Sequence, residues 1–270
     1  MSKMAKYGLI IQARYNSTRL PGKVLKKIGK HTVLNILIKR LSKLNKNFKI
    51  IVATGTNKND DKISDYLKKK KISIFRGSNK NVLSRFFDCA KKNKFKNIIR
   101  ITADCPLIDC KILEKTIELF ENKKLDYASN TMPPTFPDGL DVEVFTFSAL
   151  RKAYKYAKNT HDLEHVTPYI RKNKFFKKDN LVNSSNYSNL RWTLDEPSDL
   201  KFLNELDKKI DLIRADYRAI LKCLKKYPYI SKKNRVAIPA FYEESHHRCA
   251  EPRRRRKRGV HFWNFIDLLN

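Results

Sequence analysis

I-I-Q-A-R-Y-N-S-T-R-L-P-G-K, residues 10–23, joins an apolar run to a loop that carries three cations and two hydroxyl side chains. The run Tyr7–Ile11 is long enough for a buried strand, and between residues 32 and 44 leucines recur at helical spacing. The loop therefore links a first strand to a first helix. In an open α/β sheet, this position beyond the carboxyl end of a strand is where ligands bind.

The loop lacks a glycine-rich phosphate cradle. It contains neither G-x-x-x-x-G-K-[ST] nor G-x-G-x-x-G, so side chains rather than backbone amides must supply the charge. Arg14 and Arg19 can each make bidentate contacts with phosphate oxygens, and Lys23 adds a point charge. A solvated basic loop is the alternative for any one of these cations. The whole constellation predicts a polyphosphate site.

Strand-like and helix-like segments alternate along the chain. Further strands are expected at 48–53, 72–75 and 97–102, and helices at 60–69, 81–92 and 110–121. This alternation predicts βαβ units, hence an α/β, Rossmann-like fold with a mostly parallel sheet flanked by helices. Residues 126–148 are proline-rich and irregular, and predict an excursion over the sheet. Helices at 148–158 and 161–172, a strand at 190–194 and a helix opened by Pro197 follow.

The end of the chain differs in composition from the rest. We expect a catalytic domain over residues 1–212, an additional helix within 213–234, and an arginine-rich tail over 235–270. The tail holds seven arginines and one lysine, whereas the preceding residues hold 11 arginines and 40 lysines. This change predicts a poorly ordered or atypical end. A read-through or frameshifted sequence is favoured over a nucleic-acid patch.

The net charge of +32 would ordinarily suggest nucleic acid. The charge is spread along the chain and is mostly lysine, a composition that a low-G+C coding bias explains, so no specific nucleic acid is expected. No apolar run approaches the roughly 20 residues of a membrane span, which predicts a cytoplasmic protein without membrane contact. The five cysteines form no C-x-x-C pair and are expected to be buried thiols.

The segment A-R-Y-N-S-T-R-L-P-G-K resembles the first motif of the sugar cytidylyltransferases that activate 3-deoxy-manno-octulosonate and acylneuraminate, and most closely the spore coat polysaccharide biosynthesis protein F (SpsF-like) branch. Five more motifs match in the same order: F-R-G-S at 75–78, I-T-A-D-C-P-L-I-D at 101–109, F-P-D-G-L-D-V-E at 136–143, E-H-V-T-P-Y at 164–169 and W-T-L-D-E-P-S-D-L at 192–200. Together they cover most of residues 5–205.

This resemblance implies that a sugar hydroxyl attacks the α-phosphorus of CTP, which gives a CMP-sugar and pyrophosphate for surface polysaccharide biosynthesis. It also implies a homodimer and a metal, Mg²⁺ or Mn²⁺, held by Asp104 and Asp195. Both acids follow predicted strands and should meet at one sheet edge. Magnesium usually takes one or two carboxylates plus substrate phosphates. A turn role for Asp104 and a helix cap for Asp195 are the alternatives.

The remaining site residues are predicted in three groups. Arg14, Lys23 and Asp104 are expected to be catalytic. The nucleotide is expected to contact Ala13, Arg14, Ser17, Arg19, Lys23, Arg76 and Ser78. The sugar, an eight- or nine-carbon acidic ulosonic sugar or another, is expected to contact Asn130, Asp138, Asp141, Glu143, His165 and Arg191. Asp141 is a candidate general base, and an ordinary turn is the alternative for Asp138.

Three other functions are considered. His161-Asp162-Leu163-Glu164-His165 matches the H-x-x-E-H pattern of zinc peptidases, although the segment also fits the fifth cytidylyltransferase-like motif. A glycosyltransferase of the same fold would usually carry an Asp-x-Asp motif, which is absent. A basic nucleic-acid-binding module would interleave aromatic and basic residues on one surface, and the sequence offers only short aromatic pairs.

Overall fold

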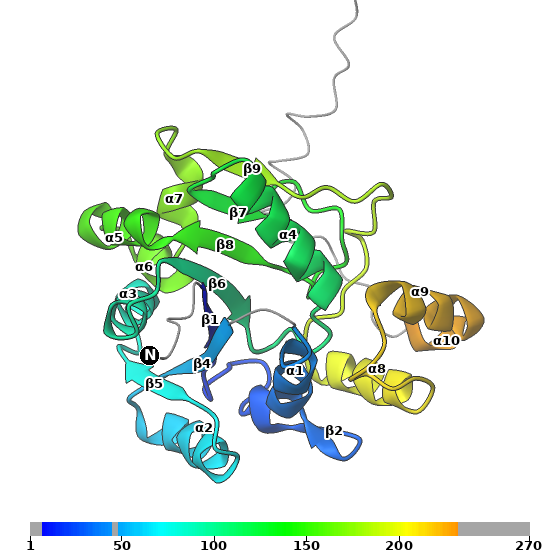
Figure 1. Cartoon of the computed structure of the whole chain (residues 1–270). Helices are drawn as coiled ribbons and strands as arrows, with labels where there is room; N and C mark the ends of the chain where they lie inside the picture. Colours follow the sequence, from blue (N-terminus) through cyan, green and yellow to red (C-terminus); the bar gives the residue numbers. More distant parts are fainter. Residues whose placement is uncertain (1–6, 45–47, 232–270) are drawn as a thin grey trace, which may run out of the picture. The chain divides into compact units, whose positions relative to one another are not determined.

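A seven-stranded sheet forms the centre of the part of the chain that the structure, a computed structural model, describes: residues 7–44 and 48–231. These residues lie within one compact unit, Met1–Ala237. The strands are β1 (Tyr7–Gln12), β4 (Phe48–Gly55), β5 (Ile74–Gly77), β6 (Asn97–Thr102), β7 (Tyr127–Ser129), β8 (Glu143–Thr146) and β9 (Lys178–Asn180). Their order is β5-β4-β1-β6-β8-β7-β9 (Figure 1). Strand β8 runs antiparallel to both of its neighbours, and the other pairs are parallel.

Helices cover both faces of this sheet. The larger core cluster includes side chains of α1 (Val33–Leu41), α2 (Lys58–Lys69), α4 (Cys110–Asn122), α8 (Pro197–Asp207), α9 (Tyr217–Lys226) and α10 (Pro228–Ser231). The other cluster includes side chains of α3 (Val82–Lys92), α5 (Phe147–Tyr156), α6 (Thr160–His165) and α7 (Pro168–Lys172). The predicted α/β fold with a mostly parallel, helix-flanked sheet is confirmed.

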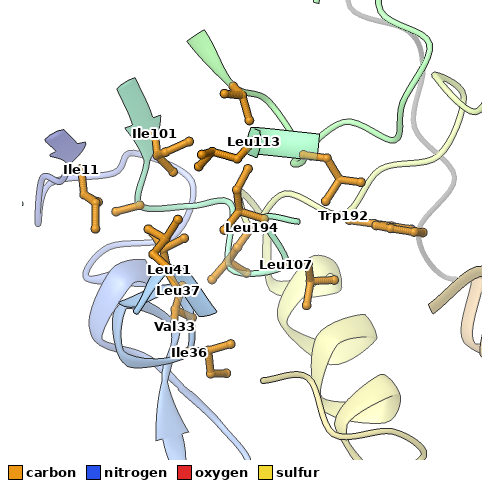
Figure 2. Packing of buried hydrophobic residues seen from close by; sticks show 14 of the residues in the cluster. Ile11, Val33, Ile36, Leu37, Leu41, Ile101, Leu107, Leu113, Trp192 and Leu194 are labelled. Atoms are coloured by element: carbon orange, nitrogen blue, oxygen red, sulfur yellow. The ribbon is translucent and has the colours of Figure 1, made fainter. Parts of the chain in front are cut away.

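Strand β1 is an almost continuous apolar run because it is buried on both faces of the sheet. Leu9 and Ile11 belong to one core cluster and Ile10 to the other, because successive side chains of a strand point to opposite faces. A central parallel strand is buried on both faces, so every position in it must be apolar. Figure 2 shows Ile11 packed in the same cluster as Leu37 of α1 and Leu194.

Three secondary-structure predictions are wrong. Residues 190–194 form no strand, and only an isolated bridge pairs Arg191 with Asp138. The helix predicted over 161–172 is two helices, α6 and α7, separated at Val166, whose φ of 71° breaks the helical path. The region 126–148 is not wholly irregular, since it contains β7 and β8, each too short to show a period in the sequence.

The predicted additional helix corresponds to α9, and the short helix α10 follows it. Ile220 and Leu224 of α9 are buried in the larger core cluster. The predictions for residues 235–270 concern residues outside those described, and the domain boundary at residue 212 stays a prediction. Among the described residues, no helix has both the length and the apolar character needed to span a membrane.

Candidate active site

Lys23, Asp104 and Asp195 meet beyond the carboxyl ends of β1 and β6. The Lys23 ammonium donates to Asp104 Oδ2 at 2.6 Å and to Asp195 Oδ1 at 2.7 Å. Only 8% of the Lys23 side chain is exposed, against 27% for Asp104 and 23% for Asp195. The structure therefore brings together three of the predicted site residues, with the cation already between the two acids.

The pKa shifts in this cluster follow from the contacts. Burial alone would lower the pKa of Lys23, but the charges of and hydrogen bonds to Asp104 and Asp195 outweigh it and the pKa is raised. Burial likewise opposes ionisation of Asp104, and the ammonium of Lys23 overcomes this and lowers the pKa of the carboxyl. Both groups are charged at neutral pH as a result.

The backbone explains why the three side chains converge. The loop after β1 is closed by a hydrogen bond from Gly22 N to the Tyr15 carbonyl at 2.9 Å. Gly22 has a φ of 68°, and the next residue, Lys23, begins a 3₁₀ turn (Lys23–Leu25). Asp104 lies two residues after the end of β6 at Thr102. Leu194 N donates to the Asp104 carbonyl at 2.8 Å, which holds the segment before Asp195 beside the end of β6.

Two arginines, Arg19 and Arg191, contact Asp195, and a third, Arg14, lies on the same cationic loop as Lys23. Arg19 contacts Asp195 Oδ2 and Glu196 Oε1, each at 3.0 Å, with 53% of its side chain exposed. Arg14 is more exposed and lies 3.3 Å from Glu164. Arg191 is only 10% exposed in its side chain and contacts Asp199 at 2.9 Å and Asp195 at 3.4 Å. Arg14 and Arg19 are therefore available to an incoming anion, whereas Arg191 fixes the segment that carries Asp195.

Asp138 and Asp141 lie on the excursion between β7 and β8, and no described residue donates a hydrogen bond to either carboxylate. Burial raises the pKa of Asp138 to about 6, assisted by Asp104 and opposed by Arg191. Burial also raises the pKa of Asp141 to about 8, and the nearby charges of Asp138 and Glu143 raise it further. These two carboxyls are the acids of the site that have titratable protons near neutral pH.

Two other residues that are predicted to contact the sugar, Asn130 and Glu143, have hydrogen-bond partners within the protein, and their contact with sugar stays a prediction. Asn130 is buried and bonds Leu140 O and Val142 N, both at 2.9 Å, so its amide ties the excursion together. Glu143 accepts from Arg100, and from Tyr127 Oη and Thr167 Oγ1 at 2.6 Å each. These partners contact both carboxylate oxygens of Glu143, so this side chain is held in place by the fold.

Of the other residues that are predicted to contact the nucleotide, three have hydrogen-bond partners within the protein. Arg76 donates to Gly55 O at 2.9 Å and pairs with Asp61 at 2.6 Å, so its guanidinium links β5 to α2. Ser78 accepts from Asn81 N in the turn before α3. Ala13 is buried and its N–H continues the β1–β4 ladder to Ala53 O. Ser17 is partly exposed on the cationic loop.

Partial burial of the imidazole of His165, the last residue of α6, and the neighbouring His161 lower the pKa of His165. The imidazole rings of His161 and His165 lie 4.7 Å apart. Within the described residues, no group of three or more histidine, cysteine or acidic side chains could hold a metal ion. The H-x-x-E-H pattern thus lacks a third ligand in this part of the chain.

Comparisons with known proteins show the family of this chain. A family model described as cytidylyltransferase matches residues 9–233. The chain belongs to the cytidylyltransferase family. It is 40% identical over 238 residues to the uncharacterized protein MJ1063 of Methanocaldococcus jannaschii, covering 87% of this chain and 97% of that protein.

Relatives with more informative names are also similar to the chain. The spore coat polysaccharide biosynthesis protein SpsF of Bacillus subtilis is 33% identical over 172 residues, 60% of this chain and 68% of SpsF. The 3-deoxy-manno-octulosonate cytidylyltransferase of Fusobacterium nucleatum is 37% identical over 122 residues, 44% and 49% of the two chains. The structure of a cytidylyltransferase from Leptospira borgpetersenii superposes with a TM-score of 0.82 and 33% identity, covering 87% of this chain and all of that one.

As a cytidylyltransferase, the chain is a nucleotidyltransferase, and its cluster fits a divalent cation. Asp104 and Asp195 each direct an oxygen at one positive centre, which is the Lys23 ammonium in this structure. Two carboxylates suit Mg²⁺, which usually retains water and takes further ligands from substrate phosphates. The assignment of the metal to these two acids stays a prediction.

Sequence reasoning missed several residues that shape this cytidylyltransferase site. Asp199 Oδ2 accepts from the backbone N–H groups of Asp195 and Glu196, at 2.8 Å each, and so orients the acid pair. Asp60 accepts from Tyr15 N at 2.7 Å and anchors the cationic loop. Arg85 is buried within α3. The sequence did carry a signal for Arg85. It lies three residues after Val82, on the apolar stripe of its helix, where a cation is unusual.

Proposed function

We propose that this cytidylyltransferase transfers CMP from CTP to a hydroxyl of an acidic ulosonic or nonulosonic sugar and releases pyrophosphate, in surface polysaccharide biosynthesis. The observation that carries the proposal is the convergence of Lys23, Asp104 and Asp195 at the sheet edge, where the exposed Arg19 also contacts Asp195. The names of the SpsF and octulosonate cytidylyltransferase relatives support the substrate class and the polysaccharide role.

In the proposed reaction, the sugar hydroxyl oxygen forms a bond to the α-phosphorus of CTP as the bond from that phosphorus to the oxygen bridging to the β-phosphorus breaks. Arg14 and Arg19 bind the triphosphate oxygens, because more than half of each arginine side chain is exposed. Lys23 adds a third positive charge. Such fixed cations neutralise the charge that develops on the leaving pyrophosphate, which is the main task in phosphoryl transfer.

Asp104 and Asp195 would hold Mg²⁺ between them. Bound there, Mg²⁺ would supply charge neutralisation at the phosphates. We assign the acceptance of the proton from the attacking hydroxyl to Asp141, whose carboxylate has no hydrogen-bond donor among the described residues. A pKa of about 8 suits this role, because a general base works best when its pKa lies near the working pH.

The test is a pyrophosphate-release assay with each of the four common nucleoside triphosphates, Mg²⁺ and a panel of sugars that includes ulosonic acids. The proposal predicts release with CTP and an acidic sugar together, and little release when either is omitted. Equal release without any sugar, or with neutral hexoses only, would contradict the proposed acceptor class.

A further inference from the structure

Arg85 is the one arginine among the described residues that is nearly fully buried without a hydrogen-bond or ion-pair partner for its guanidinium. It lies on α3, is 2% exposed, and has a buried Nε with no partner. Burying a charge without a partner is costly, and buried polar groups in folded proteins are almost always satisfied. The buried Nε of Arg85, which has no partner, therefore indicates a missing acceptor.

The position of Arg85 places this orphan at the nucleotide site. Helix α3 packs against β5 (Figure 1), and a Cβ at Gly77, the last residue of β5, would lie 3.0 Å from Arg85 Cγ. The aliphatic stem of Arg85 thus passes over the carboxyl end of β5. Asp60, which anchors the cationic loop through Tyr15 N, and Arg14 on that loop are the charges that act on the guanidinium.

The cluster of Lys23, Asp104 and Asp195 lies at the other side of the same edge, by β1 and β6. In the sheet order β5-β4-β1-β6, two to three strand spacings separate β5 from these strands, about 10 to 14 Å. A nucleotide bound along the edge with its phosphates at Lys23 would extend its base towards β5. The phosphate end is already supplied with Lys23 and Arg19, which contact Asp195, whereas Arg85 lies near Asp60 and Arg14.

We infer that Arg85 is a specificity-determining residue of the proposed cytidylyltransferase reaction and donates hydrogen bonds to the cytosine base of CTP. Cytosine presents two adjacent acceptors, O2 and N3, which match the donors of a guanidinium. Uracil carries a hydrogen on N3 and would oppose an arginine donor there. A buried, otherwise unpaired donor discriminates strongly, because the wrong base leaves it without a partner.

The electrostatics agree with this geometry. Burial lowers the pKa of Arg85 to about 10, with Asp60 opposing that shift and Arg14 adding to it. The side chain is held in an unfavourable environment until a ligand acceptor arrives. Residues kept for binding commonly reduce stability in this way.

The inference rests on the proposed function and predicts opposite changes in stability and binding. Arg85→Met has similar volume and removes the unpaired charge, so its melting temperature should equal or exceed that of the wild type. Its affinity for CTP and for CMP, measured by calorimetry, should fall at least tenfold, whereas its affinity for inorganic pyrophosphate should not change. The preference for CTP over UTP in kcat/KM should fall by a similar factor. Arg85→Lys keeps the charge but loses the fork of donors, and should also lose the preference.

Arg40→Met is the matched control, because Arg40 is equally buried but donates to Ile108 O at 2.7 Å and also to Leu212 O. It should lower the melting temperature and leave the CTP preference unchanged. Arg85→Met that is folded and keeps the wild-type preference for CTP overturns the inference, as does a loss of pyrophosphate affinity equal to the loss of CMP affinity. A wild type that releases no pyrophosphate from CTP would instead refute the proposed function.

Discussion

Replacing Lys23 by methionine tests the contact between the lysine and the two acids. The variant removes the ammonium that lies 2.6 and 2.7 Å from Asp104 and Asp195, and leaves two carboxylates facing each other. Breaking a buried ion pair from one side costs about 3 to 5 kcal/mol. Because the carboxylates are about a quarter exposed, we take the lower figure. For a domain of this size, about 3 kcal/mol corresponds to a loss of about 6 to 12 °C in melting temperature.

A divalent metal should then raise the thermal stability of the Lys23→Met variant, whereas it should not raise that of the wild type. In Lys23→Met the acids are open to a cation, and a ligand at about 100 times its dissociation constant stabilises the folded state by about 2.7 kcal/mol. In the nucleotide-free wild type, the ammonium already occupies the space between the carboxylates. The assay is thermal unfolding of both proteins across a Mn²⁺ titration, without nucleotide.

Lys111→Met is the control, since Lys111 pairs with Asp216 at 3.1 Å on the surface with 74% of its side chain exposed. Such pairs contribute about 0 to 1 kcal/mol, so the control should unfold like the wild type at every metal concentration. A Lys23→Met protein whose melting temperature is unchanged, or responds to Mn²⁺ no more than the wild type does, would refute the reasoning about this cluster.

Three further predictions concern the loop, the pH dependence and the tail. Arg14→Ala should fold normally but raise the KM for CTP about tenfold or more, since a charge-assisted contact is typically worth about 1.5 to 3 kcal/mol while its exposed pair with Glu164 adds little stability; steady-state kinetics and thermal unfolding measure both. The pKa of Asp141 is raised to about 8 from about 3.9 in an unfolded chain, so the stability that its protonated form contributes is complete below pH 4 and is lost as the pH rises to 8. The melting temperature of Asp141→Asn minus that of the wild type should therefore increase from pH 5 to pH 9. A difference that is the same at every pH would contradict this prediction. Deleting residues 235–270 should leave activity largely intact, because the family match ends at residue 233, and loss of transfer by a folded truncated protein would assign the tail a role.

The sequence predicted the parts of the molecule that repeat a simple pattern. Strand β1 could be predicted because both of its faces are buried, which requires the continuous run from Tyr7 to Ile11. Asp104 could be placed at the sheet edge because it follows such a strand. The short strands β7 and β8 could not be predicted, since three or four residues cannot establish a period of two.

The site was harder to predict from the sequence than the sheet, because side-chain partners depend on tertiary contacts between distant segments. Glu143 was predicted to contact sugar, yet Arg100 and Thr167, which lie 43 and 24 residues away, satisfy its carboxylate. Lys23 was predicted to contact phosphate, and nothing local in the sequence indicates that it contacts Asp195, 172 residues further along. The dimer implied by the family resemblance stays a prediction.

The transfer step itself is the most direct test of the account. CTP labelled at the α-phosphorus is incubated with the protein, an ulosonic sugar and increasing Mg²⁺, and the fate of the label is followed for the wild type, Asp104→Asn and Asp195→Asn. We predict that the wild type moves the label into a CMP-sugar only with divalent metal. Each variant should need more metal and turn over far more slowly, since an amide lacks the anionic oxygen that Mg²⁺ prefers. Label that stays in CTP with every ulosonic sugar tested, or folded variants with wild-type metal dependence, would contradict the account.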